Sequence, residues 1–230
     1  MHPISPSPPA WPPGRLFPPF FPPAARLGLL CLWLAVLPAC KPKELQALLQ
    51  PSQALGSVLA EECARAAGPK KHIALITYVA SRGPASTAEQ ALRDALRQRG
   101  FTVVVAKAAD VGDPMKSGRL ALKAADFLEA LEKSAGAGAV ISMVGAPSLN
   151  EGDVARLNPD HPPVLVVATA SLGDKMGVHG DPVQLAQLLE AKVIQLAIID
   201  GADPAMQTSA ELDPTRQHFD QNYRILRRPE

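Results

Sequence analysis

Four short apolar runs, separated by stretches of helical spacing, constrain the fold of this chain more than any other feature. Each run is long enough for one strand and almost continuously apolar, as in strands buried on both faces of a parallel sheet. Between the runs, apolar residues recur every three or four positions, as on one face of a helix. The alternation predicts a doubly wound three-layer α/β sandwich, a single lobe with a mainly parallel sheet of four to five strands. The four runs are 72–79, 101–106, 139–144 and 163–170.

The stretches outside these runs carry weaker patterns. Residues 41–68 predict a helix that breaks at Pro51, which lacks an amide hydrogen. After 170, Asp181 followed by Pro182 marks the start of a long helix. That helix is expected to run to Ile199, with a strand over 193–199 as the alternative. A last edge strand is expected over 223–226.

The N-terminal 40 residues resemble a bacterial lipoprotein signal. The apolar run 27–37 follows Arg26 and is too short to span a membrane. The next residues complete the sequence Leu37-Pro38-Ala39-Cys40, which is similar to a lipobox. The resemblance implies cleavage before Cys40, attachment of diacylglycerol to its thiol, and a place on the periplasmic side of the cell envelope. The absence of an aspartate directly after the cysteine favours the outer membrane. The alternative is an ordinary signal peptide followed by an incidental cysteine.

Composition limits the partners of the remaining chain. Of the 23 basic residues, Arg15 and Arg26 lie in the N-terminal segment, so 21 remain against 22 acidic residues. These nearly cancel, so there is no electrostatic case for nucleic-acid binding. If Cys40 is acylated, Cys63 has no disulfide partner and is expected to be a small buried apolar residue. The expected division is a signal peptide with a Pro-rich leader at 1–39, a lipidated tether and helix at 40–70, an α/β domain at 71–204 and a polar tail at 205–230.

Polar residues follow three of the four runs, where ligands bind in open parallel sheets. They offer hydroxyls, one guanidinium, one carboxylate and one aromatic ring, which suits a small polar ligand held by hydrogen bonds. The alternative is that the serines and threonines cap helices and that Arg82 is a solvated surface charge. The predicted ligand-binding residues are Tyr78, Ser81, Arg82, Ser148, Thr169, Ser171 and Asp174.

Motifs for catalysis or cofactor binding are missing from the sequence. There is no Gly-x-Ser-x-Gly elbow, no phosphate loop of the Walker type, and no Gly-x-Gly-x-x-Gly after the first run. The densest polar loop holds Ser171, Asp174, His179 and Asp181, which with His161 would suit a hydrolase or a metal site. A capped helix preceded by a polar loop explains the same residues. We therefore expect no cofactor, no metal and no catalysis.

Residues 71–204 resemble the first lobe of the sugar-type substrate-binding proteins of ABC importers, which have the type I periplasmic-binding fold. The segments that carry the resemblance are HIALIT at 72–77, AVISMVGAP at 139–147, PVLVVAT at 163–169, GADP at 201–204 and RQHFDQNYRIL at 216–226. The resemblance implies that the seven residues named above face a ligand. Those proteins have two lobes, and the 60 residues after Ala170 are too few for a second lobe.

Two functions follow as expectations. The first is a lipid-anchored module that binds or senses a small, sugar-like molecule without catalysis, with a second copy or a permease as partner. In that case the apolar helix after Asp181 would form the dimer contact. The second is an envelope scaffold lipoprotein that binds no small ligand. A hydrolase that uses the 171–181 loop is a third and weaker alternative.

Overall fold

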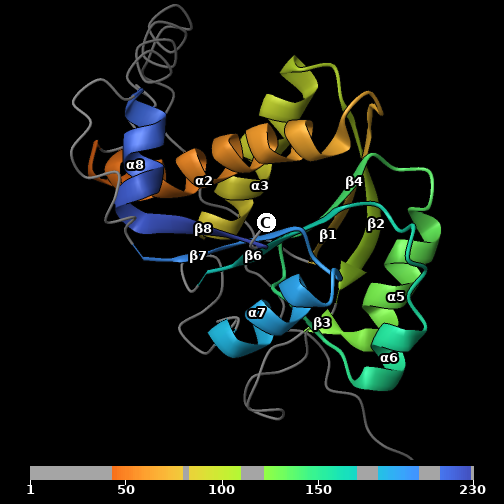
Figure 1. Ribbon diagram of the computed structural model, residues 1–230. Coiled ribbons are helices and arrows are strands. Elements are labelled where there is room, and N and C mark those ends of the chain that lie inside the picture. The colour runs from red at the N-terminus through yellow and green to blue at the C-terminus, as the bar shows by residue number, and fades with distance from the viewer. Residues whose placement is uncertain (1–42, 80–82, 110–121, 170–180, 202–212, 229–230) are drawn as a thin grey trace, which may run out of the picture. The chain divides into compact units, whose positions relative to one another are not determined.

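The computed structural model describes residues 43–79, 83–109, 122–169, 181–201 and 213–228 (Figure 1). Its main feature is a six-stranded sheet of order β2-β1-β4-β6-β7-β8. The first five strands in this order are parallel, and β8 pairs antiparallel with β7 at one edge. The strands are β1 (His72–Tyr78), β2 (Thr102–Ala109), β4 (Ala139–Ser142), β6 (Val164–Ala168), β7 (Leu196–Asp200) and β8 (Tyr223–Arg227), and β3 (Leu122–Lys123) pairs with β5 (Pro147–Ser148) in a separate two-stranded sheet.

Helices cover both faces of the sheet and confirm the predicted doubly wound α/β fold. In Figure 1, α2, α3 and α8 lie on one side and α5, α6 and α7 on the other. The buried side chains form two clusters, one on each face, as expected for a three-layer sandwich. The helices are α2 (Lys43–Ala67), α3 (Gly83–Gln98), α5 (Ala124–Lys133), α6 (Glu151–Ala155), α7 (Pro182–Glu190) and α8 (Pro214–Asn222).

The central strands are buried on both faces, which explains their continuous apolar sequences. All of β4 and β6 is buried, as are the middle five residues of β1. Because side chains alternate along a strand, Ile73 and Leu75 join the cluster under α2 and α3, and Ala74 and Ile76 join the cluster under α5 and α7. A strand in which polar and apolar residues alternate could supply apolar side chains to only one of the two clusters.

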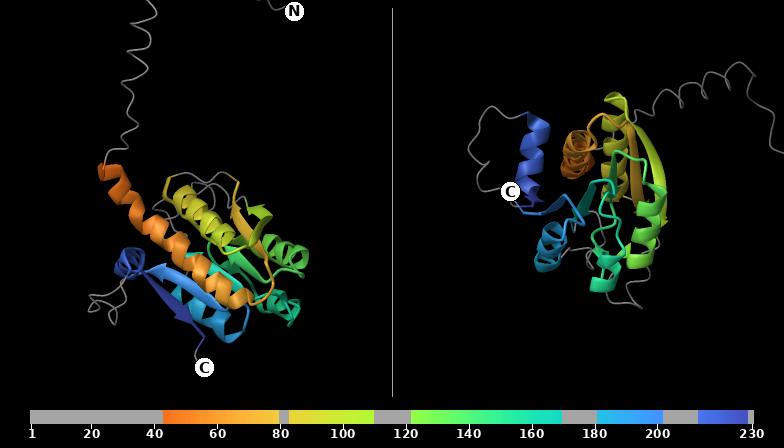
Figure 2. Two further views of the ribbon diagram at one scale, coloured as in Figure 1. Left: turned by 90° about the horizontal axis from the view of Figure 1, so that it is seen from above. Right: turned by 45° about the vertical axis from the view of Figure 1, so that its right-hand side comes forward.

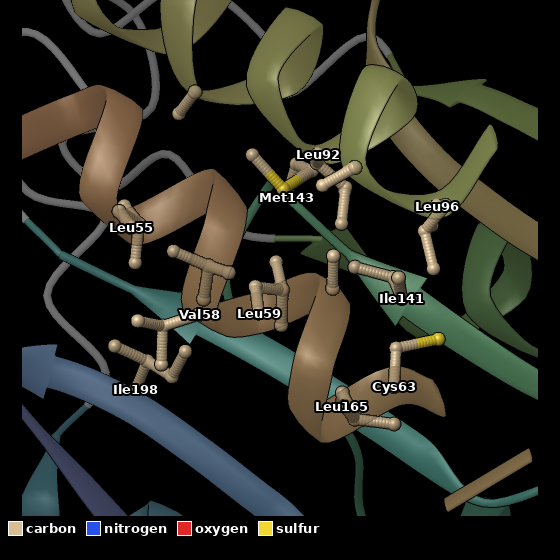
Figure 3. Close-up of a cluster of buried hydrophobic side chains, with 14 of the residues drawn as sticks. Leu55, Val58, Leu59, Cys63, Leu92, Leu96, Ile141, Met143, Leu165 and Ile198 are labelled. Atoms are coloured by element: carbon tan, nitrogen blue, oxygen red, sulfur yellow. The ribbon is translucent and has the colours of Figure 1, made fainter. Parts of the chain in front are cut away.

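Helix α2 forms part of the core, and the predicted break at Pro51 is wrong. The helix continues through Pro51. The carbonyl that loses its partner there belongs to Ala47, an exposed residue, so water can satisfy it. Beyond Pro51, one face of α2 is buried against α3, β4, β6 and β7 (Figure 3). Seen from above, α2 lies between α3 and α8 (Figure 2).

The free thiol of Cys63 lies in this cluster, as the sequence predicts (Figure 3). Burial raises its pKa to about 12. The thiol is therefore protonated at neutral pH, and it packs as a small apolar side chain.

The C-terminal region differs from the predicted long helix. Helix α7 ends at Glu190, and 196–200 is the strand β7, which confirms the alternative assignment. Lys192 adopts a left-handed backbone conformation, with φ 61°, just after the helix and turns the chain back toward the sheet. With β7 and the predicted edge strand β8, the sheet has six strands, one more than expected. Lys43–Glu230 forms one compact unit.

Two groups of charged residues connect elements that are distant in sequence. Glu62 of α2 is only 2% exposed and pairs with Arg65 at 2.8 Å and with Arg227 of β8 at 2.7 Å. On the other face, Glu129 of α5 accepts a hydrogen bond of 2.6 Å from Lys107 of β2. Hydrogen bonds from Lys107 and Lys133 lower the pKa of Glu129 to about 2.

Among the helices described, none is long and apolar enough to span a bilayer.

Candidate functional site

The topology places a switch point between β1 and β4. Helix α3 leads from β1 to β2 over one face of the sheet, and α6 leads from β4 toward β6 on the opposite face (Figure 1). The chain therefore leaves the carboxyl ends of β1 and β4 in opposite directions, and a crevice forms at such a point in open α/β sheets. We call this region the switch-point site; it comprises Thr77 and Tyr78 of β1, Glu89 and Arg93 of α3, and 142–145 at the end of β4.

Tyr78 supplies the most unusual group of the switch-point site. Its ring is half-buried against the cluster under α5 and α7. Its hydroxyl is buried but makes no hydrogen bond to the part of the chain that the structure describes. Burial raises the pKa of Tyr78 to about 12, so the hydroxyl keeps its proton at neutral pH. A buried hydroxyl without a hydrogen-bond partner costs about 1–3 kcal/mol of folding free energy. A ligand that supplies the missing hydrogen bond would recover part of this cost as binding free energy.

A second polar group lies on the α3 side of β1. Thr77 is buried, and its Oγ1 donates a hydrogen bond of 2.6 Å to Oε2 of Glu89. Arg93 donates from Nε to Oε1 of the same carboxylate at 2.8 Å. These two hydrogen bonds hold the Glu89 carboxylate at the end of the strand, and the side chain as a whole is 15% exposed.

The sequence prediction overlooked these three residues. A signal for Glu89 was present, because it falls on the same helical stripe as Ala85 and Leu92, which are both buried. An acid on an apolar stripe needs a buried partner or a ligand.

Strand β4 ends in a tight turn, and hydrogen bonds made by the residues of the turn hold it in place. The hydroxyl of Ser142 is fully buried and donates to the carbonyl of Gly145 at 2.7 Å. Gly145 has φ 89°, a conformation that favours glycine over other residues. The amide of Met143 donates to the carbonyl of Ile76 at 2.9 Å, which holds this turn beside β1.

Three of the seven predicted ligand-binding residues lie in the described part of the chain. Tyr78 is at the switch-point site. Thr169 follows β6 and is 1% exposed, and Ser148 is exposed on β5, where it pairs with Lys123 of β3. The other four, Ser81, Arg82, Ser171 and Asp174, lie outside the described residues, as does Cys40. Their roles stay predictions.

The alternative hydrolase or metal loop is only partly described, because Ser171, Asp174 and His179 lie outside the described residues. Asp181 has the predicted capping role: its Oδ1 accepts a hydrogen bond of 2.9 Å from the amide of Val183. Nδ1 of His161 lies 2.8 Å from the carbonyl oxygen of Pro162. Within the described ranges, no three His, Cys, Asp or Glu side chains converge as metal ligands would.

Comparison with known proteins gives a distant structural likeness. No family model matches the chain, and no curated protein matches it. Among solved structures, the chain is similar to GanP, a glucose-galactose binding protein from Geobacillus stearothermophilus, with a TM-score of 0.46 and 12% sequence identity. The alignment covers 77% of this chain and 60% of that protein.

Proposed function

We propose that this protein is a lipid-anchored module of the cell envelope whose switch-point site binds a small, sugar-like molecule without catalysis. The observation that carries the ligand-binding part is the buried hydroxyl of Tyr78. It lacks a hydrogen-bond partner within the described residues and lies at the strand end where open α/β sheets bind ligands. Buried polar groups in proteins are almost always satisfied, and a bound polar molecule would satisfy this one.

The chemistry of the site suits a molecule with several hydroxyls. The phenol of Tyr78 can donate one hydrogen bond and accept another. The carboxylate of Glu89, held by Arg93 and Thr77, is a fixed acceptor for hydroxyl donors. We propose that Ser81, Arg82, Ser171 and Asp174 add contacts from the loops after β1 and β6, with Ser148 and Thr169 alongside.

The ligand-binding proposal predicts saturable thermal stabilisation of the full chain by one member of a panel of pentoses, hexoses and nucleosides. For that compound, Tyr78→Phe should weaken binding about two- to twelvefold, the value of one hydrogen bond of about 0.5–1.5 kcal/mol. The same substitution should not lower the melting temperature of the free protein, because the hydroxyl has no hydrogen-bond partner to lose among the described residues.

Tyr223→Phe is the matched control, since Tyr223 is the second of the two tyrosines and lies on β8. It should leave the affinity unchanged. If no compound in the panel stabilises the wild-type chain, the ligand-binding proposal fails and the scaffold alternative is favoured.

The anchor proposal predicts that Cys40→Ser moves the protein from the membrane fraction to the soluble fraction of the cell envelope. The physical reason is that the acyl chains attached to this thiol would supply the membrane affinity. Immunoblots of sedimented membranes measure the distribution, and Cys63→Ser is the control that should stay with the membranes. Continued membrane retention of Cys40→Ser would contradict the anchor and leave the ligand proposal untouched.

A further inference from the structure

A cavity of about 500 Å³ lies at the amino edge of the sheet, at the opposite ends of the strands from the switch-point site. Its walls come from the segment before β6, the segment before β7, and the end of β8. The sheet itself joins these three: Gln195 donates from its amide to the carbonyl of Val164 at 2.8 Å, and Leu196 pairs with Arg227. We call this cavity the amino-edge pocket.

Basic side chains line the amino-edge pocket, and none of its lining residues in the described part of the chain is a carboxylate. The basic lining residues are His161, Lys192, Arg227 and Arg228. Lys192, Arg227 and Arg228 are exposed to solvent. Lys192 and Arg228 form no ion pair with any residue that the structure describes. The pocket therefore gathers positive charge that the described chain does not neutralise, although the protein as a whole is close to neutral.

Arg227 is held at the pocket by a carboxylate outside it. One terminal nitrogen of its guanidinium donates to Oε2 of the buried Glu62 at 2.7 Å. A guanidinium carries five N–H donors in a planar fork, so the remaining donors are available to a ligand. Glu62 thus fixes a guanidinium at the wall without entering the pocket.

The backbone of Lys192 gives a second, independent indication. It occupies the left-handed position just after α7, where glycine is usual and other side chains are strained. Strain of this kind is often retained where the side chain has a function. Here the strained residue places at the pocket an ammonium group that forms no ion pair with the described residues.

We propose that the amino-edge pocket binds a phosphate monoester. Such a group carries close to two negative charges at neutral pH, which match the unpaired charges of Lys192 and Arg228. Arginine forks suit phosphate oxygens, and lysine binds them as a point charge. The pocket is much larger than a phosphate ion, and Pro163 and Ile194 give it apolar walls, so it has room for a compact organic group on the ester.

The phosphate monoester group could belong to either of two kinds of ligand, a soluble phosphomonoester or a lipid with a phosphomonoester headgroup. Glycerol 3-phosphate and vesicles of phosphatidylcholine with phosphatidic acid represent them. The site does not depend on the proposed sugar-binding function, because the two regions share no residue.

Calorimetric titration of the full chain with glycerol 3-phosphate should show saturable one-to-one binding. Lys192→Gly should weaken it at least tenfold without lowering the melting temperature, because glycine relieves the left-handed strain while the ammonium group is lost. Arg228→Gln should weaken it similarly. Arg97→Gln, which removes an exposed charge on α3 paired with Asp94, should leave the affinity unchanged, as should Tyr78→Phe.

If the lipid is the source, phosphatidic acid in the vesicles should increase binding of the wild-type chain over pure phosphatidylcholine, and Lys192→Gly should abolish that increase. Binding of either probe with this dependence on Lys192 supports the phosphomonoester site, and the responding probe identifies the source. The proposal is overturned if neither probe binds saturably, if Lys192→Gly binds as well as wild type, or if Arg97→Gln weakens binding equally.

Discussion

Gly56→Ala is expected to destabilise the protein by about 3 kcal/mol, the upper part of the usual range for overpacking a core. Gly56 lies on α2 where the helix meets α3. An added methyl group would overlap the carbonyl oxygen of Ala88 and sit 2.8 Å from the amide nitrogen of Leu92. Both neighbours are backbone atoms of a helix, so no side-chain rotation relieves the contact. Relief requires α2 and α3 to move apart, which opens the cluster between them.

Denaturant unfolding of the two proteins measures this effect as a lower midpoint with an unchanged slope. Gly136→Ala is the matched control, because an added methyl group there meets no atom within 4 Å and the backbone is not left-handed. That substitution should change stability by less than about 0.5 kcal/mol, as at other surface sites. Equal midpoints for Gly56→Ala and wild type would show that α2 does not pack on α3 as described.

Phe127→Ala should cost about 3–5 kcal/mol, the range for removing a buried aromatic side chain. Phe127 lies on α5, is fully buried, and packs in the cluster between this helix and the sheet. The lost contacts and the cavity left behind both contribute. The effect tests the second helical layer, as Gly56→Ala tests the first.

Leu128→Ala is the comparison, since Leu128 is the next residue of α5 and only half-buried. It should cost less than half as much, because part of its side chain is already in water. The free energies of unfolding of both variants come from the same urea titrations. A smaller loss for Phe127→Ala than for Leu128→Ala would mean that the face of α5 toward the sheet has been assigned wrongly.

The sequence predicts the strands well, because burial on both faces requires apolar residues throughout. Strands β1, β4 and β6 appear as continuous apolar runs, and the edge strand β8 was also predicted. The place of α2 was harder to predict, since its apolar stripe fits a peripheral helix as well as a buried one. Only the position of Gly56 against the backbone of α3 shows how closely the two helices approach. The strand β7 was assigned to a helix because Leu196–Asp200 is short and directly follows a helical pattern.

The candidate sites were less predictable, since they depend on contacts between distant segments. Tyr78 could be predicted from its place at the end of the first apolar run. Its unsatisfied hydroxyl could not, because that depends on every neighbour of the folded chain. The bond from Thr77 to Glu89 likewise requires α3 to be placed on the sheet. The amino-edge pocket joins three segments, and the pair Glu62 and Arg227 is separated by 165 residues.

The switch-point site is tested most directly by nuclear magnetic resonance of the full chain with ¹³C at the ζ carbon of tyrosine. The chain has two tyrosines, so two resonances report on Tyr78 and Tyr223 separately. As the stabilising compound from the panel is added, the Tyr78 resonance should move saturably while that of Tyr223 stays in place, because only the Tyr78 hydroxyl gains a partner. If the compound binds and the Tyr78 resonance does not move, the ligand lies elsewhere, and the assignment of the switch-point site is wrong.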